Sequence, residues 1–163
     1  MAQDAVDAVC RRLGVVAGCR TGEHRLVGAT GYDTDFWKKI RDEYGLESEI
    51  AQHLARQYGT RAVEVAALAQ ENPVWGGRLA VGFPFLKAEV VYAVRHEMAA
   101  SLRDVLARRI RLEILDWQAT IATAPTAAQI MGPELGWTQQ QIEQETEAYI
   151  GLIREFQRRA SSA

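Results

Sequence analysis

A histidine and a glutamate stand side by side at positions 96 and 97, opening the H-E-x-x-H pattern that zinc hydrolases carry on a helix. The pattern needs a second histidine one helical turn later. This sequence has Ala100 there, and alanine cannot bind a metal. The other two histidines, His24 and His53, have no further ligands at a useful spacing. We therefore predict no metal site in this chain.

Four arginines follow closely along the chain: Arg103, Arg108, Arg109 and Arg111. Guanidinium groups match the geometry of phosphate, so such a cluster is a candidate anion site. The same stretch also holds Glu97, Asp104 and Glu113, at spacings that allow ion pairs such as Asp104 with Arg108. We favour ion pairs that fix the register of the helices. A phosphate role for one arginine stays open only if that arginine faces another domain.

Other patterns that carry chemistry are missing or incomplete. Residues 126–153 have the outline of a helix-turn-helix, but the second helix carries Glu143, Glu145 and Glu147, which would repel a DNA backbone. No G-x-S-x-G elbow is present, and no strand-to-helix turn of the form G-x-G-x-x-G could hold a dinucleotide. We predict no catalytic or cofactor-binding residue in this chain, and no nucleic-acid partner.

Composition is that of one folded domain. The chain has 163 residues, of which 48% are hydrophobic, and a net charge of −2, which gives no general affinity for nucleic acids or anionic membranes. Cys10 and Cys19 are predicted to be free thiols in a reducing compartment. No apolar stretch approaches the roughly 20 residues of a membrane span, so we expect no transmembrane segment. Residues 1–14 lack the apolar core of a signal peptide, and any targeting signal is expected to lie outside this sequence.

The N-terminal residues 1–31 differ from the rest. Residues 3–13 place their apolar side chains on one side, with acids early and bases late, which predicts a short amphipathic helix. Residues 14–31 contain five glycines and are predicted to form a linker. A separate helical domain is therefore expected at 32–163.

Residues 32–163 predict an all-α irregular bundle of about six helices. Asp33 or Thr34 is expected to cap the first, which ends at Gly45; a second covers 47–58, and Thr60 is expected to cap a third over 61–70. Residues 80–85 are a candidate extended segment. Between Pro84 and Pro125 there is no glycine or proline, which predicts one long helix or two in tandem, the second beginning at a Ser101–Asp104 capping box. A short helix over 126–135, interrupted at 132–133, and a last helix from Thr138 complete the set.

Three segments resemble the C-terminal helical domain of FAD-dependent glycerol-3-phosphate dehydrogenase of the mitochondrial type. They are YGLESEIAQHLARQYGTRAVEVA (44–66), AEVVYAVRHEMAASLRDVLARRIRL (88–112) and IMGPELGW (130–137). The opening MAQDAVDAV is similar to the stretch that leaves the flavin domain in that family. The resemblance runs in order over nearly the whole chain and is weak at 10–31 and after Ile150.

The resemblance implies that a parent enzyme oxidises sn-glycerol 3-phosphate to dihydroxyacetone phosphate at a bound FAD and passes the electrons to a membrane quinone. The FAD loop, the base and most of the substrate-binding residues of that family lie upstream, and none of its catalytic residues is carried over to this sequence. Its partners would be the flavin and substrate domains of the same protein, in a mitochondrial parent associated with the inner membrane, or at the bacterial cytoplasmic membrane as an alternative. The family's calcium-binding units are not implied, because no D-x-D-x-D-G loop is present.

We therefore expect a cap domain that is inactive alone and contains no cofactor of its own. A paired polar network on its central helices is predicted from Glu89, Tyr92, Glu97, Asp104, Arg108, Arg109 and Arg111. Replacement of Arg108 by Leu is expected to destabilise the domain if the acidic partner is buried. The alternative is a free-standing helical module that binds another protein through an exposed apolar patch.

Overall fold

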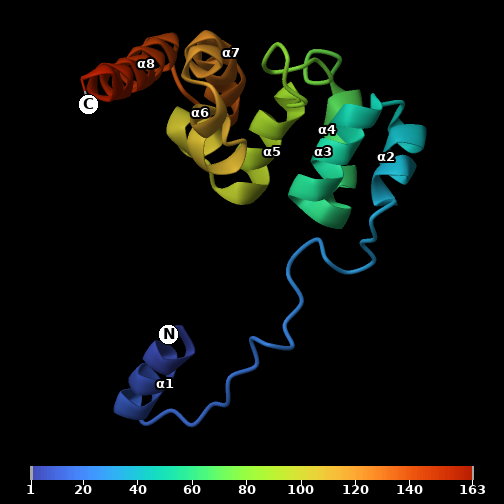
Figure 1. Ribbon diagram of the computed structural model, residues 1–163, viewed down its shortest axis with the longest axis vertical. Helices are drawn as coiled ribbons and strands as arrows, with labels where there is room; N and C mark the ends of the chain where they lie inside the picture. Colours follow the sequence, from blue (N-terminus) through green and yellow to red (C-terminus); the bar gives the residue numbers. More distant parts are fainter. Residues whose placement is uncertain (1, 163) are drawn as a thin grey trace.

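The computed structural model describes residues 2–162, which are all-α, as predicted, and contain no strand. Apart from one short 3-10 turn and one π turn, the elements are eight α-helices: α1 (Ala2–Leu13), α2 (Phe36–Tyr44), α3 (Ser48–Tyr58), α4 (Ala62–Glu71), α5 (Lys87–Glu97), α6 (Leu112–Leu115), α7 (Trp117–Leu135) and α8 (Gln139–Ser161). The 3-10 turn covers Gly59–Arg61, and the π turn η2 covers Asp104–Arg109. From α2 onward the helices follow one another across the body, with α5 in the middle (Figure 1).

Helix α5 separates two hydrophobic cores. On one side α2, α3 and α4 pack around Ile40, Leu54 and Val65; on the other, η2, α6, α7 and α8 pack around Leu106 and Met131. Every residue from Ala88 to Ala93 is buried, so α5 is apolar around most of its circumference rather than along one stripe. Such a pattern is typical of a helix enclosed by others.

The prediction of one or two helices between Pro84 and Pro125 is wrong. The chain turns at Met98 and again at Arg111, both of which adopt the left-handed conformation, with φ of 56° and 65°. The Ser101–Asp104 capping box forms, but it opens the π turn η2 rather than a long helix. Sequence rules that look for glycine at such positions find neither turn, because here ordinary residues take the left-handed conformation.

Helix α7 also differs from expectation, since it runs without interruption through Pro125 and Pro133. Both proline rings are exposed, whereas Ala124, Ala127, Ala128 and Met131 are fully buried on the opposite face. Burial of that face outweighs the backbone bonds that the prolines cannot make. Residues 80–83, part of the candidate extended segment 80–85, form a turn with a bend on either side.

The residues at the helix ends agree in part with those expected from the sequence. Helix α8 begins at Thr138 and Gly45 ends α2 with φ of 64°, both as predicted; Thr138 also forms a capping box with Gln141. Helix α2 begins later than expected, with Asp35 as its N-cap residue. Thr60 does not cap a helix; its hydroxyl and backbone N–H donate to the carbonyl of Gly28, at 3.2 and 2.9 Å.

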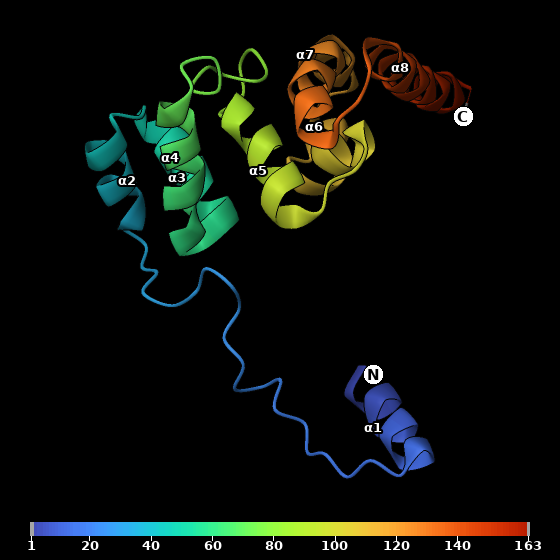
Figure 2. The ribbon, with the colours of Figure 1, turned by 180° about the vertical axis from the view of Figure 1, so that it is seen from behind.

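Helix α1 and most of the linker lie apart from the body in both views (Figures 1 and 2). No residue of α1 is buried, and Val6, Val9 and Leu13 expose their apolar side chains. The linker meets the body at Gly28, whose backbone lies so close to Tyr58 and Gly59 that an added Cβ would fall 2.5 Å from the Tyr58 carbonyl oxygen. Glycine at 28 therefore allows the linker to reach the C-terminal end of α3.

Candidate functional site

The most buried charged residue in the described chain is Glu89, in the first turn of α5, with 0% of its surface exposed. Its Oε1 accepts a hydrogen bond from the N–H of Leu86 at 2.7 Å. Its Oε2 accepts one from the Tyr58 hydroxyl at 3.0 Å and lies 2.8 Å from Nε2 of His53. The carboxylate thus joins the start of α5 to two positions on α3.

Tyr92 lies one turn further along α5 and links α5 to the start of α4. Its hydroxyl donates to Glu64 at 3.1 Å and accepts from Arg61 at 3.4 Å. The rings of Tyr58 and Tyr92 meet edge to face, with centroids 5.3 Å apart. Burial and the negative charge of Glu89 raise the pKa of Tyr58 well above its usual value, so this phenol stays protonated and acts as a donor.

Glu97 and Arg109 connect the end of α5 to the end of η2. Arg109 donates to the backbone carbonyl of Glu97 at 2.6 Å, and its Nε lies 3.6 Å from the Glu97 carboxylate. Burial raises the pKa of Glu97, although the positive charge of Arg109 opposes this. Gln57 on α3 donates to the Arg109 carbonyl at 3.0 Å, so α3, α5 and η2 meet here.

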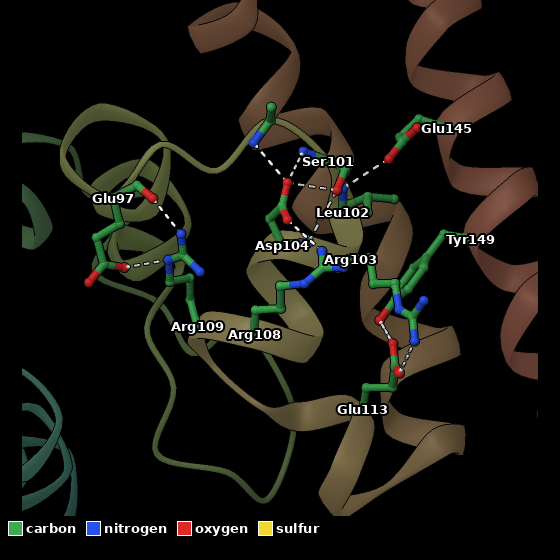
Figure 3. A network of polar contacts seen from close by, with 11 residues as sticks. Glu97, Ser101, Leu102, Arg103, Asp104, Arg108, Arg109, Glu113, Glu145 and Tyr149 are labelled. Carbon is green, nitrogen blue, oxygen red and sulfur yellow. Dashed lines mark hydrogen bonds and ion pairs between the residues drawn. The ribbon is translucent and has the colours of Figure 1, made fainter. Parts of the chain in front are cut away.

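Asp104 forms the centre of a second group, at the start of η2 (Figure 3). It accepts from the backbone N–H of Ala100 and Ser101, from the Ser101 hydroxyl, and from Arg108 at 2.5 Å. Burial alone would raise the pKa of Asp104, but these hydrogen bonds outweigh it and the pKa lies below its usual range. The group holds the loop after α5 against η2.

A third group joins η2 and α6 to α8 (Figure 3). Tyr149 donates to Glu113 at 2.7 Å, and Arg103 lies 3.6 Å from the same carboxylate. Burial, followed by the hydrogen bond to Glu113, raises the pKa of Tyr149, which therefore stays protonated. Glu145 accepts from the backbone N–H of Leu102 at 2.9 Å. The hydrogen bonds of Tyr149 and Glu145 link residues 36 and 43 positions apart in sequence.

The expected ion pair of Asp104 with Arg108 forms, and two pairs that helical spacing did not predict also form: Arg103 with Glu113, and Arg109 with Glu97. The seven predicted network residues do not form one continuous network, because Glu89 and Tyr92 belong to the α3–α4–α5 contact, whereas the others lie at η2. The side chain of Arg111 makes no hydrogen bond or ion pair with any described residue and is exposed.

Sequence reasoning missed several partners in these groups: His53, Tyr58, Arg61, Glu64, Glu145 and Tyr149. All lie far along the chain from the residues they contact. A spacing rule within one helix has no signal for such a pair. Only knowledge of which helices are neighbours could have found them.

These polar groups are suited to joining helices. Their carboxylates already accept hydrogen bonds or face arginines, and two of the tyrosines are held as protonated donors. Among the described residues no three of His, Cys, Asp and Glu are arranged to hold a metal ion. A dinucleotide site is not built from residues 2–162 either, since they contain no strand that could precede a glycine-rich turn.

Comparison with known proteins identifies the fold's family. Residues 19–142 match the family described as the C-terminal domain of alpha-glycerophosphate oxidase. The chain belongs to this family, which confirms the resemblance seen in the sequence. No solved structure matches the fold.

Curated relatives extend the match to most of the chain. It is 39% identical over 153 residues to the mitochondrial glycerol-3-phosphate dehydrogenase of Mesocricetus auratus, and 36% identical over 152 residues to that of Homo sapiens. In both cases 90% of this chain is covered but only 21% of the relative. A probable enzyme of the same name from Caenorhabditis elegans is 40% identical over 144 residues. The chain thus spans about a fifth of the length of these relatives, which have further domains.

None of the described helices combines the length and the apolar character that a membrane span requires.

Proposed function

We propose that this chain is the helical cap domain of an FAD-dependent glycerol-3-phosphate dehydrogenase and is inactive alone. The observation that carries the proposal is the family match over 19–142, combined with coverage of only about a fifth of dehydrogenases that match nearly the whole chain. In this proposal, residues 1–31 lead from the flavin domain, and residues 32–163 form the cap. The parent would oxidise sn-glycerol 3-phosphate to dihydroxyacetone phosphate.

The residues of this chain would contribute structure, because the polar groups described above join α3, α4, α5, η2 and α8. FAD would be held by the upstream domain, since the described residues do not fit a dinucleotide site. The names of the relatives support a mitochondrial parent. Transfer of electrons to a membrane quinone, and association with the inner membrane, belong to the same proposal; a bacterial membrane remains the alternative location.

A free-standing interaction module is the second candidate, because α1 and the linker expose apolar side chains that a partner protein could cover. The two proposals differ in the partner that they require. If the reading frame upstream of this chain encodes a strand followed by G-x-G-x-x-G, the partner is a flavin domain of the same protein.

Reconstitution tests the proposal directly. The flavin domain is produced separately, loaded with FAD and mixed with this chain; binding and glycerol-3-phosphate-dependent dye reduction are then measured. We expect no dye reduction by this chain alone, and association with gained or stabilised activity in the mixture. A folded, FAD-loaded flavin domain that neither binds nor responds would contradict the cap proposal and favour the module.

A further inference from the structure

The two cysteines of the chain, Cys10 in α1 and Cys19 in the linker, border one open pocket of about 670 Å³. One wall of this pocket is a single face of α1, where Gln3, Val6 and Cys10 follow at spacings of three and four residues. The other wall is formed by residues between 17 and 24, so the linker passes along α1 before it leads to the body. Both thiols are free; Cys19 is exposed and Cys10 is half-buried.

The surroundings of Cys19 favour its thiolate, which is the form that reacts with disulfides. The Cys19 Sγ lies 3.0 Å from the hydroxyl oxygen of Thr21, and hydrogen bonds from the hydroxyl and the backbone N–H of Thr21 lower the pKa of Cys19. The negative charge of Asp7 on α1 opposes this shift, so Cys19 lies within electrostatic range of the helix face that also carries Cys10. Because Cys19 is exposed, a small molecule can reach its sulfur from solution.

The linker can bring Cys19 against Cys10 without disturbing the body. Residues 14–27 are all exposed, so their displacement breaks no buried contact. Gly14 and Gly18 lie between the two cysteines and leave the backbone there a wide choice of conformations. A disulfide needs the two Cα atoms to come within about 7 Å of each other, which closing the pocket over this short loop allows.

We propose that Cys10 and Cys19 form a reversible disulfide when the chain meets a low-molecular-weight disulfide such as oxidised glutathione. The Cys19 thiolate attacks one sulfur of oxidised glutathione, which forms a mixed disulfide and releases the first glutathione. The Cys10 thiolate then attacks the Cys19 sulfur and releases the second. The two protein thiols lose two electrons and two protons, and oxidised glutathione takes up both to become two molecules of glutathione. Excess glutathione reverses the two steps.

The disulfide would act on the connection between α1 and the body. In the reduced chain the whole exposed stretch 14–27 spans this distance. In the oxidised chain residues 10–19 form a closed ring, and only residues 20–27 remain to reach Gly28. Helix α1 buries no residue, so the covalent bond would also fix the linker against a helix face that is otherwise open. Oxidation would therefore restrict how far α1 can move from the body.

Reaction of the reduced chain with oxidised glutathione, followed by mass spectrometry, tests the inference. For wild type we expect a monomer that has lost both free thiols and about 2 Da, after a mixed disulfide that is present only briefly. In Cys10→Ser the glutathione adduct on Cys19 should persist, because no second thiol displaces it. Excess reduced glutathione should restore both thiols of wild type. All substituted positions lie outside the two cores, so each variant should fold as wild type does.

A displaced cysteine distinguishes a positioned pair from two thiols on one flexible chain. Cys19→Ser combined with Val27→Cys moves the second thiol to another linker position, which is 76% exposed. The longer loop alone should slow ring closure only about threefold, whereas loss of the shared pocket should slow it at least tenfold. Closure as fast as in wild type would overturn the inference. A wild-type chain that keeps glutathione on Cys19, or that links to a second copy through its cysteines, would overturn it as well.

Discussion

Helices α1 and α5 have nearly the same length and opposite surroundings. Helix α1 carries one apolar stripe and buries nothing, whereas α5 buries six successive residues between two cores. A twelve-residue helix without tertiary contacts is marginal in water, so α1 depends on a partner in a way that α5 does not. The comparison shows that helical periodicity predicts the element but not the surface that covers it.

The largest effect is expected at Glu89, within the body. Glu89→Ala removes the acceptor of the Leu86 N–H and the Tyr58 hydroxyl and leaves His53 without its carboxylate. Loss of one partner from such a buried group costs about 3–5 kcal/mol, and thermal unfolding would measure it. Glu89→Gln keeps the shape and one acceptor oxygen and should cost clearly less. Equal melting temperatures for Glu89→Ala and wild type would show that the α3–α5 contact does not hold the body together.

Truncation of one leucine in the body and one in α1 compares how much each region contributes to the free energy of unfolding. Leu106→Ala opens a cavity in the core between α5 and α8 and should cost about 2–5 kcal/mol in chemical denaturation. Leu13→Ala, at the end of α1, should change the stability by less than about 0.5 kcal/mol because that side chain is 72% exposed. Similar losses in the two variants would mean that α1 packs against the body.

Replacement of two helical glycines by alanine should change the stability of the protein in opposite directions. At Gly132 in α7 an added Cβ would lie 2.4 Å from Cδ1 of buried Ile142, so Gly132→Ala should destabilise the body by about 1–3 kcal/mol. At Gly151 in α8 nothing lies within 4 Å, and Gly151→Ala should stabilise the helix by up to about 1 kcal/mol. Calorimetry of both variants provides the test; a gain in stability for Gly132→Ala would contradict the close packing of α7 on α8.

A small effect is expected for Arg108→Leu. Asp104 also accepts from Ser101 and Ala100, and the Arg108 side chain is 54% exposed, so the loss at pH 7 should stay below about 1 kcal/mol. Asp104 has a lowered pKa in the folded state, so its contribution is present above the pKa of the unfolded chain and is lost as the pH falls through the folded pKa. The stabilities of variant and wild type should therefore converge in acid. A difference that grows as the pH falls would be inconsistent with this pairing.

The sequence predicted the all-α class, the Asp104–Arg108 ion pair and the start of α8 at Thr138, because each depends on residues close along the chain. It did not predict the turns at Met98 and Arg111, where packing holds ordinary residues in a conformation that local rules assign to glycine. The sequence also did not predict that α7 continues through Pro125 and Pro133. The helix is maintained there because the face opposite the prolines is buried. The sequence could not predict the contacts of Glu89 with His53 and Tyr58, because these contacts require that α3 and α5 are neighbours in the fold.

Hydrogen exchange of this chain, alone and with the FAD-loaded flavin domain, tests most directly whether it is a docked cap. We expect α5 and α7 to be protected in both samples, and α1 to become protected only in the mixture. Protection of α1 in the chain alone, or a complex that leaves α1 unchanged, would contradict the account.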